Sequence, residues 1–188
     1  TKSTILNYSH SQGAVTGTNY VGGLVGYNFS SAITSSYSTG PVTAHDLGYN
    51  IGGLVGCAEG QDSAISTSYA SGKVTGGSTS HEIGGLVGYN NSNSLIASSY
   101  SSGNVAGGSG SYEIGGLVGY SSSSAITNSY SKGAVTGGAS LGGFAGKAVS
   151  SQIIRNYWTP KPQDKRVALA PAPVPWKARS PQRWSMAP

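Results

Sequence analysis

Charged residues are scarce in this sequence, and they are unevenly distributed. Only 9% of the 188 residues are Asp, Glu, Lys or Arg, although the formal net charge is +5. The segment from Thr1 to Trp158 is neutral, and the residues after it carry six of the eleven basic side chains. Proteins that bind nucleic acid carry clustered basic residues on the face that meets the phosphates. The neutral segment therefore excludes nucleic acid as its partner.

Cysteine pairs, long apolar runs and helix-forming stretches are missing as well. The single cysteine, Cys57, excludes an internal disulfide and a metal site built from cysteines. No apolar run is long enough to cross a membrane, so we expect no membrane span in this chain. No basic-then-apolar leader opens the sequence, so we expect a processed or excised piece of a longer protein. The thirty glycines would cost a helical repeat about 1 kcal/mol each, which excludes helical repeat folds.

Two blocks of residues recur along the chain with a period of about 30 residues. The first block is Gly-Gly-Leu-Val-Gly, with a Gly-Gly-Phe-Ala-Gly variant last; its copies begin at Gly22, Gly52, Gly84, Gly115 and Gly142. The second block has an apolar residue, a tyrosine, a glycine and a valine at fixed offsets, as in Ile33, Tyr37, Gly40 and Val42. Successive copies of its first position are 27, 32, 31, 30 and 27 residues apart. Since the step from that position to the valine keeps its length, constant strands joined by variable loops are indicated.

This pattern predicts an all-β fold, a parallel β-helix (β-solenoid) of about five to six coils with repeats of about 30 residues. Tyr, Val, Ile and Thr favour strands, whereas the Gly, Asn and Ser clusters between them favour turns. One repeat cannot bury its own apolar side, so the repeats have to stack about 4.8 Å apart. Stacking predicts core columns of Ile, ending at Ile153, and of Val, starting at Val15. It also predicts an aromatic column from His10 to Tyr157, and the Leu and Val of each glycine-rich corner should both be covered.

The Gly-Leu-Val-Gly core of these blocks resembles the GLUG motif, a repeat of large bacterial surface proteins. The resemblance covers Leu6 to Trp158; proteins with such repeats include filamentous-haemagglutinin-like adhesins and proteins related to immunoglobulin A peptidases. It implies an extracellular repeat module of an adhesin-like bacterial surface protein, secreted or at the cell surface, with a binding or stalk role. It carries over no catalytic residue. A purely structural, self-associating fibre or stalk unit stays open as the alternative function.

The resemblance also divides the chain into repeats at 1–158 and an irregular Pro- and Arg-rich tail at 159–188. The family's last repeat usually ends in a pattern like Tyr-Trp-Asp-Thr-Glu-Thr, which Tyr157 and Trp158 match before the agreement stops. Reading from the last base of the Trp158 codon forces an aspartate at the next position and permits the rest of that ending. The tail is therefore either a frameshift product or a true proline-rich linker, and both interpretations stay open.

The repeats contain no constellation of catalytic or metal-binding residues. His10, His45 and His81 lack the spacing of metal ligands, and no aspartate recurs as a calcium-binding repeat would need. No serine lies in a nucleophile elbow, and the glycine-rich corners open no helix that would bind phosphate. We therefore expect no enzyme activity, no metal site and no cofactor.

The candidate binding surface is the loop before each Gly-Gly pair, which is three residues longer in the middle three repeats. Aligned on the isoleucine that directly follows them, these loops stack an aromatic column beside a polar one: Tyr49, His81 and Tyr112 beside Asn50, Glu82 and Glu113. Aromatic side chains beside carboxylates and amides suit the binding of sugars or of a partner protein. We therefore expect these six residues to form one binding ridge, with a host glycan or a matrix protein as the partner.

Two alternatives to this ridge stay open. The loops are either solvated tips without a ligand, or the chain associates with itself through the sheet edges at its coil ends. A second tyrosine column follows the glycine-rich corner at Tyr27, Tyr89 and Tyr120 and is interrupted by Cys57 and Lys147. We interpret this column as ladder packing at a turn and not as a binding strip.

Overall fold

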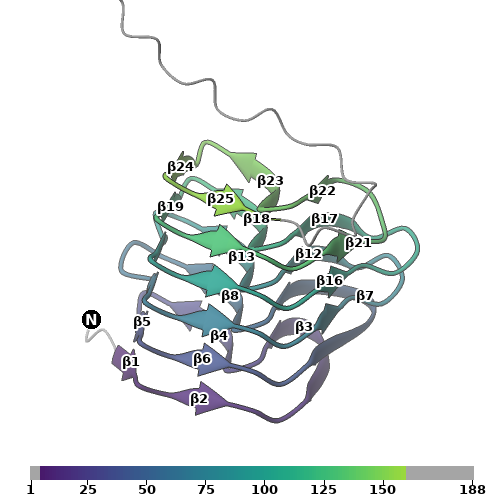
Figure 1. The fold of residues 1–188 in the computed structure, drawn as a ribbon, viewed down its shortest axis with the longest axis horizontal. Helices are drawn as coiled ribbons and strands as arrows, with labels where there is room; N and C mark the ends of the chain where they lie inside the picture. Colours follow the sequence, from purple (N-terminus) through teal and green to yellow (C-terminus); the bar gives the residue numbers. More distant parts are fainter. Residues whose placement is uncertain (1–4, 160–188) are drawn as a thin grey trace, which may run out of the picture.

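The computed structural model describes residues 5–159, and these residues form 25 short strands and no helix. The strands pair in parallel and build four sheets, which we name A to D in the order in which the chain meets them (Figure 1). Five coils contribute to all four sheets, and a sixth contributes only its first two strands. The predicted parallel β-helix is therefore confirmed.

Sheets A and B come from the block that runs from the isoleucine to the tyrosine. Sheet A consists of β1 (Ile5–Asn7), β5 (Ala32–Thr34), β9 (Ala64–Ser66), β14 (Leu95–Ala97), β19 (Ala125–Thr127) and β24 (Gln152–Ile154). Sheet B consists of β2 (His10–Ser11), β6 (Tyr37–Ser38), β10 (Tyr69–Ala70), β15 (Tyr100–Ser101), β20 (Tyr130–Ser131) and β25 (Tyr157–Trp158).

Sheets C and D lie on the two sides of the glycine-rich corner. Sheet C consists of β3 (Val15–Gly22), β7 (Val42–Gly52), β11 (Val74–Thr75), β12 (His81–Gly84), β16 (Val105–Ala106), β17 (Tyr112–Gly115), β21 (Val135–Thr136) and β22 (Leu141–Gly142). Sheet D consists of β4 (Val25–Phe29), β8 (Val55–Glu59), β13 (Val87–Asn91), β18 (Val118–Ser122) and β23 (Ala145–Val149).

Aliphatic side chains fill the interior in two clusters that run along the stack. Sheet A and the glycine-rich corners supply one cluster, in which Ile65 and Leu86 are fully buried, and sheet C supplies the other, with Val74 and Ile83. The predicted columns are thus confirmed in the middle coils, where the Leu and Val of each corner are both covered. The last predicted member, Ile153, is instead 42% exposed, because no described coil stacks on it.

The Gly-Gly pair closes the corner between sheets C and D. A Cβ atom on Gly85 would meet the carbonyl oxygen of Gly116 in the next coil and the side chain of Ser101. Gly53 has equivalent surroundings, with Ala70 in the place of the serine. Glycine therefore lets successive corners and the small inward residue of sheet B pack directly against one another. A larger residue there would push the coils apart.

Serine closes the corner between sheets A and B. The hydroxyl of Ser99 donates to the carbonyl of Ala97 at 2.8 Å and accepts from the backbone N–H of Ser68 at 3.2 Å. The preceding residue, Ser98, has a φ of 48°, which turns the chain from one sheet to the next. The same arrangement recurs in the other coils, at Ser9, Ser36, Ser68 and Ser129. The high serine content is therefore part of a hydrogen-bonded ladder rather than low-complexity sequence.

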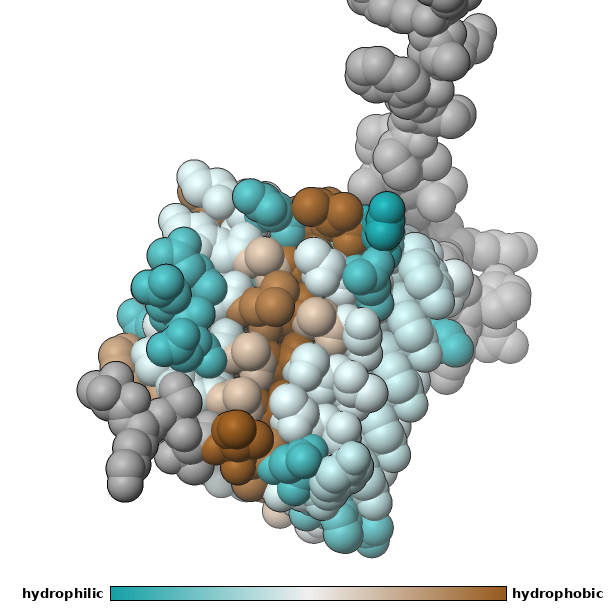
Figure 2. Space-filling model, turned by 90° about the vertical axis from the view of Figure 1, so that its left-hand side faces the viewer, coloured by the Kyte–Doolittle hydropathy of each residue, from teal (hydrophilic) through white to brown (hydrophobic). Residues whose placement is uncertain are grey.

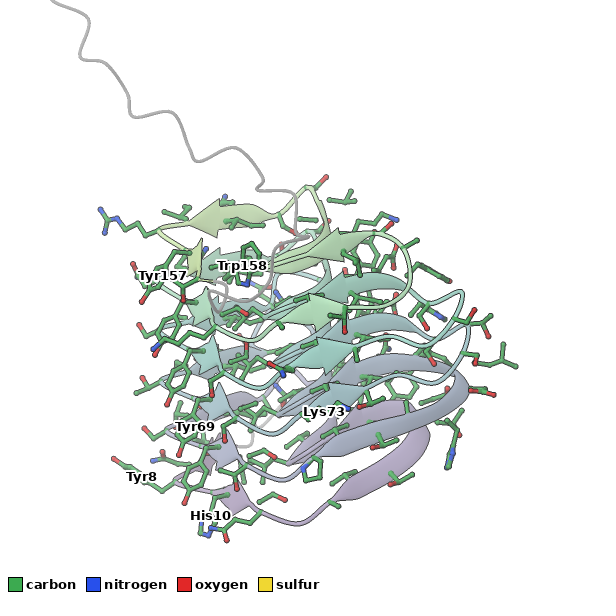
Figure 3. All side chains as sticks on the ribbon, turned by 45° about the vertical axis from the view of Figure 1, so that its right-hand side comes forward. Tyr8, His10, Tyr69, Lys73, Tyr157 and Trp158 are labelled. Carbon is green, nitrogen blue, oxygen red and sulfur yellow. The ribbon has the colours of Figure 1, made fainter. Side chains whose placement is uncertain are left out.

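The predicted aromatic column runs along sheet B. The ring centroids of Tyr69 and Tyr100 lie 5.0 Å apart with 5° between the ring planes, and His10 stacks on Tyr37 at 5.1 Å. The inner rings are half-buried on the outer side of the sheet (Figure 3). The residue after each tyrosine points inward instead, as the fully buried Ser101 does after Tyr100. The column is therefore a surface stack and not part of the core.

Trp158 covers the end of the stack. It pairs with Ser131 in sheet B, but its indole lies across Gly143 at the last corner. At the previous corner, Gly116 faces the carbonyl of Gly143 and the side chain of Ser131, and Trp158 is the counterpart of that serine in the next coil. In Figure 3 Tyr157 projects outward, whereas Trp158 lies over the coils. The predicted tail, 159–188, lies outside the described residues except for Thr159.

Candidate functional site

The aromatic half of the predicted binding ridge forms a second column of rings, which lies in sheet C. Tyr49 pairs with His81, and His81 pairs with Tyr112. The ring centroids are 5.7 Å and 5.0 Å apart, with 23° and 2° between the planes. Tyr112 is 41% exposed, and the other two side chains are half-buried. We call these three residues the aromatic ridge; their predicted register is confirmed.

The polar column beside the ridge turns away from it. Asn50, Glu82 and Glu113 have φ angles of 56°, 57° and 57°, which break the alternation of an extended strand. Asn50 is only 4% exposed and Glu113 only 8%, while Glu82 is half-buried. The six predicted residues therefore do not form one exposed ridge. The polar three lie against the side chains of sheet D instead.

An ion pair joins this polar column to sheet D. The carboxylate of Glu113 lies 2.8 Å from the ammonium of Lys147, which is also 4.8 Å from the ring centroid of Tyr120. The hydrogen bond and the negative charge of Glu113 raise the pKa of Lys147. Because the lysine side chain is 48% exposed, this pair between the fourth and fifth coils contributes little to stability.

Glu82 lies between Asn50 and Glu113 in the stack. Burial raises the pKa of Glu82 to about 7; the charge of Glu113 adds to the rise, and Lys147 opposes it. The amide oxygen of Asn50 is buried without a hydrogen-bond partner among the described residues. Burial also lowers the pKa of the neighbouring His81. The charge of this column therefore changes close to neutral pH.

A second aromatic group lies in the first coil, where the sequence predicted no site. Tyr20 lies edge to face against Tyr27 (5.5 Å, 81°) and against Tyr49 (5.1 Å, 77°), and Phe29 stacks beside Tyr27 at 6.3 Å. The Tyr27 hydroxyl donates to the Glu59 carboxylate at 2.7 Å. We call Tyr20, Tyr27 and Phe29 the first-coil cluster; they are 41%, 47% and 60% exposed.

The sequence signal for this cluster is a departure from the repeat. Tyr20 lies in the column of Asn50, and Phe29 pairs with Glu59, so two aromatic residues replace polar ones. Because these aromatic residues occur in one coil only, the recurring pattern of the sequence does not reveal them. The tyrosines after the later corners behave as interpreted, since Tyr89 and Tyr120 pair and stack at 5.3 Å.

Loop residues near the ridge have structural roles. The carboxylate of Asp46 accepts from the backbone N–H of Ser78 in the next coil at 2.7 Å, and the carbonyl of His45 accepts from the Ser80 hydroxyl at 3.2 Å. Both contacts tie one long loop to the next. They hold the loops in register beside the ridge.

Two other surface features offer little chemistry. Figure 2 shows a narrow apolar stripe along the stack on the side of sheet A, where the exposed large apolar residues include Ile5, Leu95 and Ile154. A shallow cavity of about 260 Å³ has a small, neutral lining: Asn93, Ser123, Ser124, Ala125, Ser150 and Gln152. Neither feature contains a charged group that would act as an acid, a base or a metal ligand.

Metal-binding clusters and an activated cysteine are both missing from the described residues. Within residues 5–159, no group of three or more His, Cys, Asp or Glu is placed to hold a metal ion. Cys57 is buried, and burial raises its thiol pKa to about 12, so the thiolate that would act as a nucleophile is suppressed. In the same part of the chain no helix has the length and apolar character to cross a membrane.

Comparison with protein families identifies the repeat. The GLUG motif matches residues 17–43, 48–75 and 110–136, which together make up less than half of the chain. Each match contains one glycine-rich corner and ends one residue after the valine of the following coil, so one motif corresponds to one turn of the solenoid. No curated protein and no solved structure matches the chain. GLUG repeats in a β-solenoid indicate a structural repeat module rather than an enzyme.

Proposed function

We propose that this chain is a non-catalytic module of an extracellular, adhesin-like bacterial surface protein, where it serves as a stalk that presents a binding surface. GLUG repeats are typical of extracellular repeat proteins, and three of them match here. The proposal places the parent protein outside the cell, either secreted or at the bacterial surface. The family context of adhesins and of proteins related to immunoglobulin A peptidases belongs to the same proposal.

The recurring register of the coils, which shifts once between Gly17 and Asn19 in sheet C, is the observation that carries this proposal. Equivalent residues pair from coil to coil in all four sheets, and sheet A runs from β1 at one end to β24 at the other (Figure 1). Each coil adds about 4.8 Å along the stack. A stack of this kind sets the distance between its ends by the number of repeats, which is what a stalk requires.

The adhesive part of the proposal assigns the aromatic ridge to a host glycan or a matrix protein. Ser, Thr, Asn and Gly make up a large part of the remaining surface, and these small side chains give little contact area. Binding energy concentrates in aromatic and a few charged side chains. Since Asn50 and Glu113 are buried, the contacts would come from the three ridge rings, and Tyr112 is the most accessible of them.

A binding screen of the full chain against a glycan array and immobilised collagen and fibronectin tests this role. On any hit, the double variant Tyr49→Ala with Tyr112→Ala should bind at least about tenfold more weakly, since it removes two contact rings. Tyr157→Ala, which removes an exposed ring elsewhere, is the matched control. An unchanged affinity in the double variant removes the ridge and leaves the stalk role, and so does a screen without a hit.

Self-association is the second candidate function, and the first coil favours it. The strands β1 and β4 have one unpaired edge each, and Ile5 and Phe29 are 67% and 60% exposed there. Unpaired edges with apolar side chains are common sites of association. Light scattering of the chain, with and without an added capping repeat, decides between the candidates. A mass that rises with concentration only in the uncapped chain would favour a self-associating fibre or stalk unit.

A further inference from the structure

No ring of the first-coil cluster is stacked between two others, whereas the middle ring of the aromatic ridge is. In the ridge, centroid distances of 5.0–5.7 Å mean that both faces of the middle ring are covered by its neighbours. In the cluster, Tyr20 meets its aromatic neighbours at 77° and 81°, so its ring is not part of a parallel stack. Tyr27 and Phe29 lie on β4, the edge strand of sheet D, and no described strand continues the sheet beyond them. Apart from each other, at 6.3 Å, Tyr27 and Phe29 have no stacked ring among the described residues.

Solenoid packing does not explain these aromatic residues. The position of Tyr20 belongs to Asn50 and Glu82 in the next coils, and the position of Phe29 belongs to Glu59 and Asn91. The later coils pair in the same sheets with polar residues at these positions. Large exposed aromatic side chains that depart from their own repeat are typical of a binding surface.

Polar groups border the ring faces on one side. The Tyr27 hydroxyl donates to one oxygen of the Glu59 carboxylate at 2.7 Å, and the Ser92 hydroxyl reaches the other oxygen at 3.5 Å. This hydrogen bond, with burial and the charge of Glu59, raises the pKa of Tyr27 to about 12, so its hydroxyl stays protonated. The border therefore combines hydroxyl groups that donate and accept with a carboxylate that accepts.

We propose that the first-coil cluster binds a neutral saccharide. A sugar ring presents a face of C–H groups, which packs against an aromatic face, and a rim of hydroxyls, which hydrogen-bonds to neighbouring polar groups. Tyr20, Tyr27 and Phe29 supply the aromatic faces, and Glu59 supplies an acceptor for sugar hydroxyls. The negative charge of Glu59 disfavours anionic polysaccharides. The inference rests on the proposed function in one respect: an extracellular protein would meet free or cell-surface sugars. The proposed sugar contact lies on a different surface from the aromatic ridge.

Isothermal titration of the full 188-residue chain tests the site. The probes are hexasaccharides of glucose and of N-acetylglucosamine, with heparin as the anionic comparison. The variant Tyr20→Asn with Phe29→Asn installs the residues that later coils use at these positions, so the fold should persist. We expect saturable binding of a neutral hexasaccharide, at least about tenfold weaker in this variant, and no binding of heparin. Glu59→Gln, which keeps every ring, should weaken binding by about threefold or more.

The variant Tyr157→Asn, which removes a 53% exposed ring outside both surfaces, is the matched control and should bind as the wild type does. Binding that is lost in Tyr112→Asn but kept in the cluster variant would overturn this site, while it would support the ridge of the proposed function. The absence of binding to both neutral hexasaccharides, or preferential binding of heparin, would overturn the site and leave the stalk role intact. A wild-type dimer that becomes monomeric in the cluster variant, seen by light scattering, would identify the cluster as a self-contact and also overturn the proposal.

Discussion

Tyr100 and Tyr157 are equivalent residues with different numbers of aromatic neighbours. Tyr100 stacks on Tyr69 at 5.0 Å and on Tyr130 at 4.9 Å, whereas Tyr157 stacks only on Tyr130, at 5.1 Å, among the described residues. Each aromatic pair contributes about 0.5–1.5 kcal/mol beyond the buried area. We expect Tyr100→Ala to lower the free energy of unfolding by about 2 kcal/mol and Tyr157→Ala by about 1 kcal/mol, measured by urea unfolding. A larger loss at Tyr157 would contradict the stacking argument.

Glu82 makes the stability of the solenoid depend on pH. Its pKa in the folded chain is about 7, above the ordinary value of 4.5, so the folded state holds a proton that the unfolded state releases. The associated stabilisation is complete below about pH 4.5 and is lost as the pH rises through about 7. We therefore expect Glu82→Gln to flatten the fall of the melting temperature between pH 5 and pH 8, measured by circular dichroism at about unit steps.

His81 works in the opposite direction, so the comparison of Glu82→Gln with the wild type matters more than the wild-type curve alone. The lowered pKa of His81 means that its contribution to stability grows as the pH rises through the ordinary range of histidine. Asp62→Asn, at an exposed acid in a loop, is the control and should leave the pH profile unchanged. A profile that does not respond to Glu82→Gln would show that the Glu82 carboxyl is better solvated than its burial indicates.

The residue scale also shows where the sequence stops being informative. The constant step of the repeat places Ile96, Tyr100 and Val105 in their columns, because stacking allows no other register. The repeat pattern does not predict to which side of the strand the Glu82 side chain turns. Its left-handed φ is shared by Tyr20, which has an unrelated side chain, so the corner geometry imposes it and the residue type does not.

At the scale of the elements, the serine corner between sheets A and B offers a direct test. Ser99 is buried, and its hydroxyl bonds both to its own coil, at Ala97, and to the preceding coil, at Ser68. Ser99→Ala leaves the Ser68 N–H without that acceptor, and we expect a loss of about 1–3 kcal/mol in urea unfolding. Ser109→Ala, at an exposed loop position, should cost less than about 0.5 kcal/mol. Equal effects would mean that the serine ladder does not join the coils.

The elements that recur were predictable, and the elements that differ between coils were not. Period and residue type were sufficient for the strands and for the glycine-rich corner, since both repeat in every coil. The serine corner also repeats, three residues after each isoleucine, but abundant serine elsewhere hides it. The first-coil cluster depends on contacts between Tyr20 and its neighbours on two sheets, which no single repeat encodes.

At the scale of the whole molecule, the indole of Trp158 should protect the last coil. It lies across Gly143, and its N–H donates to the carbonyl of Gly133 at 3.4 Å. We expect Trp158→Ser, which restores the residue of the preceding coil, to speed amide hydrogen exchange in β23 by about tenfold. Exchange in β8 should stay unchanged, because a solenoid opens from its ends. An equal acceleration in both strands would mean that the indole stabilises the whole stack instead of its end.

The position of this indole also bears on where further repeats can be added to such a chain. Trp158 pairs with Ser131, and its indole lies against the last described corner at Gly143. A new coil fits between existing ones, where both neighbours present the same sequence of strands. Duplication of one period, such as residues 65–95, would add a turn and leave Tyr157 and Trp158 at the end. Recombination between near-identical repeats would then change the length of the solenoid while the residues Tyr157 and Trp158 are inherited unchanged.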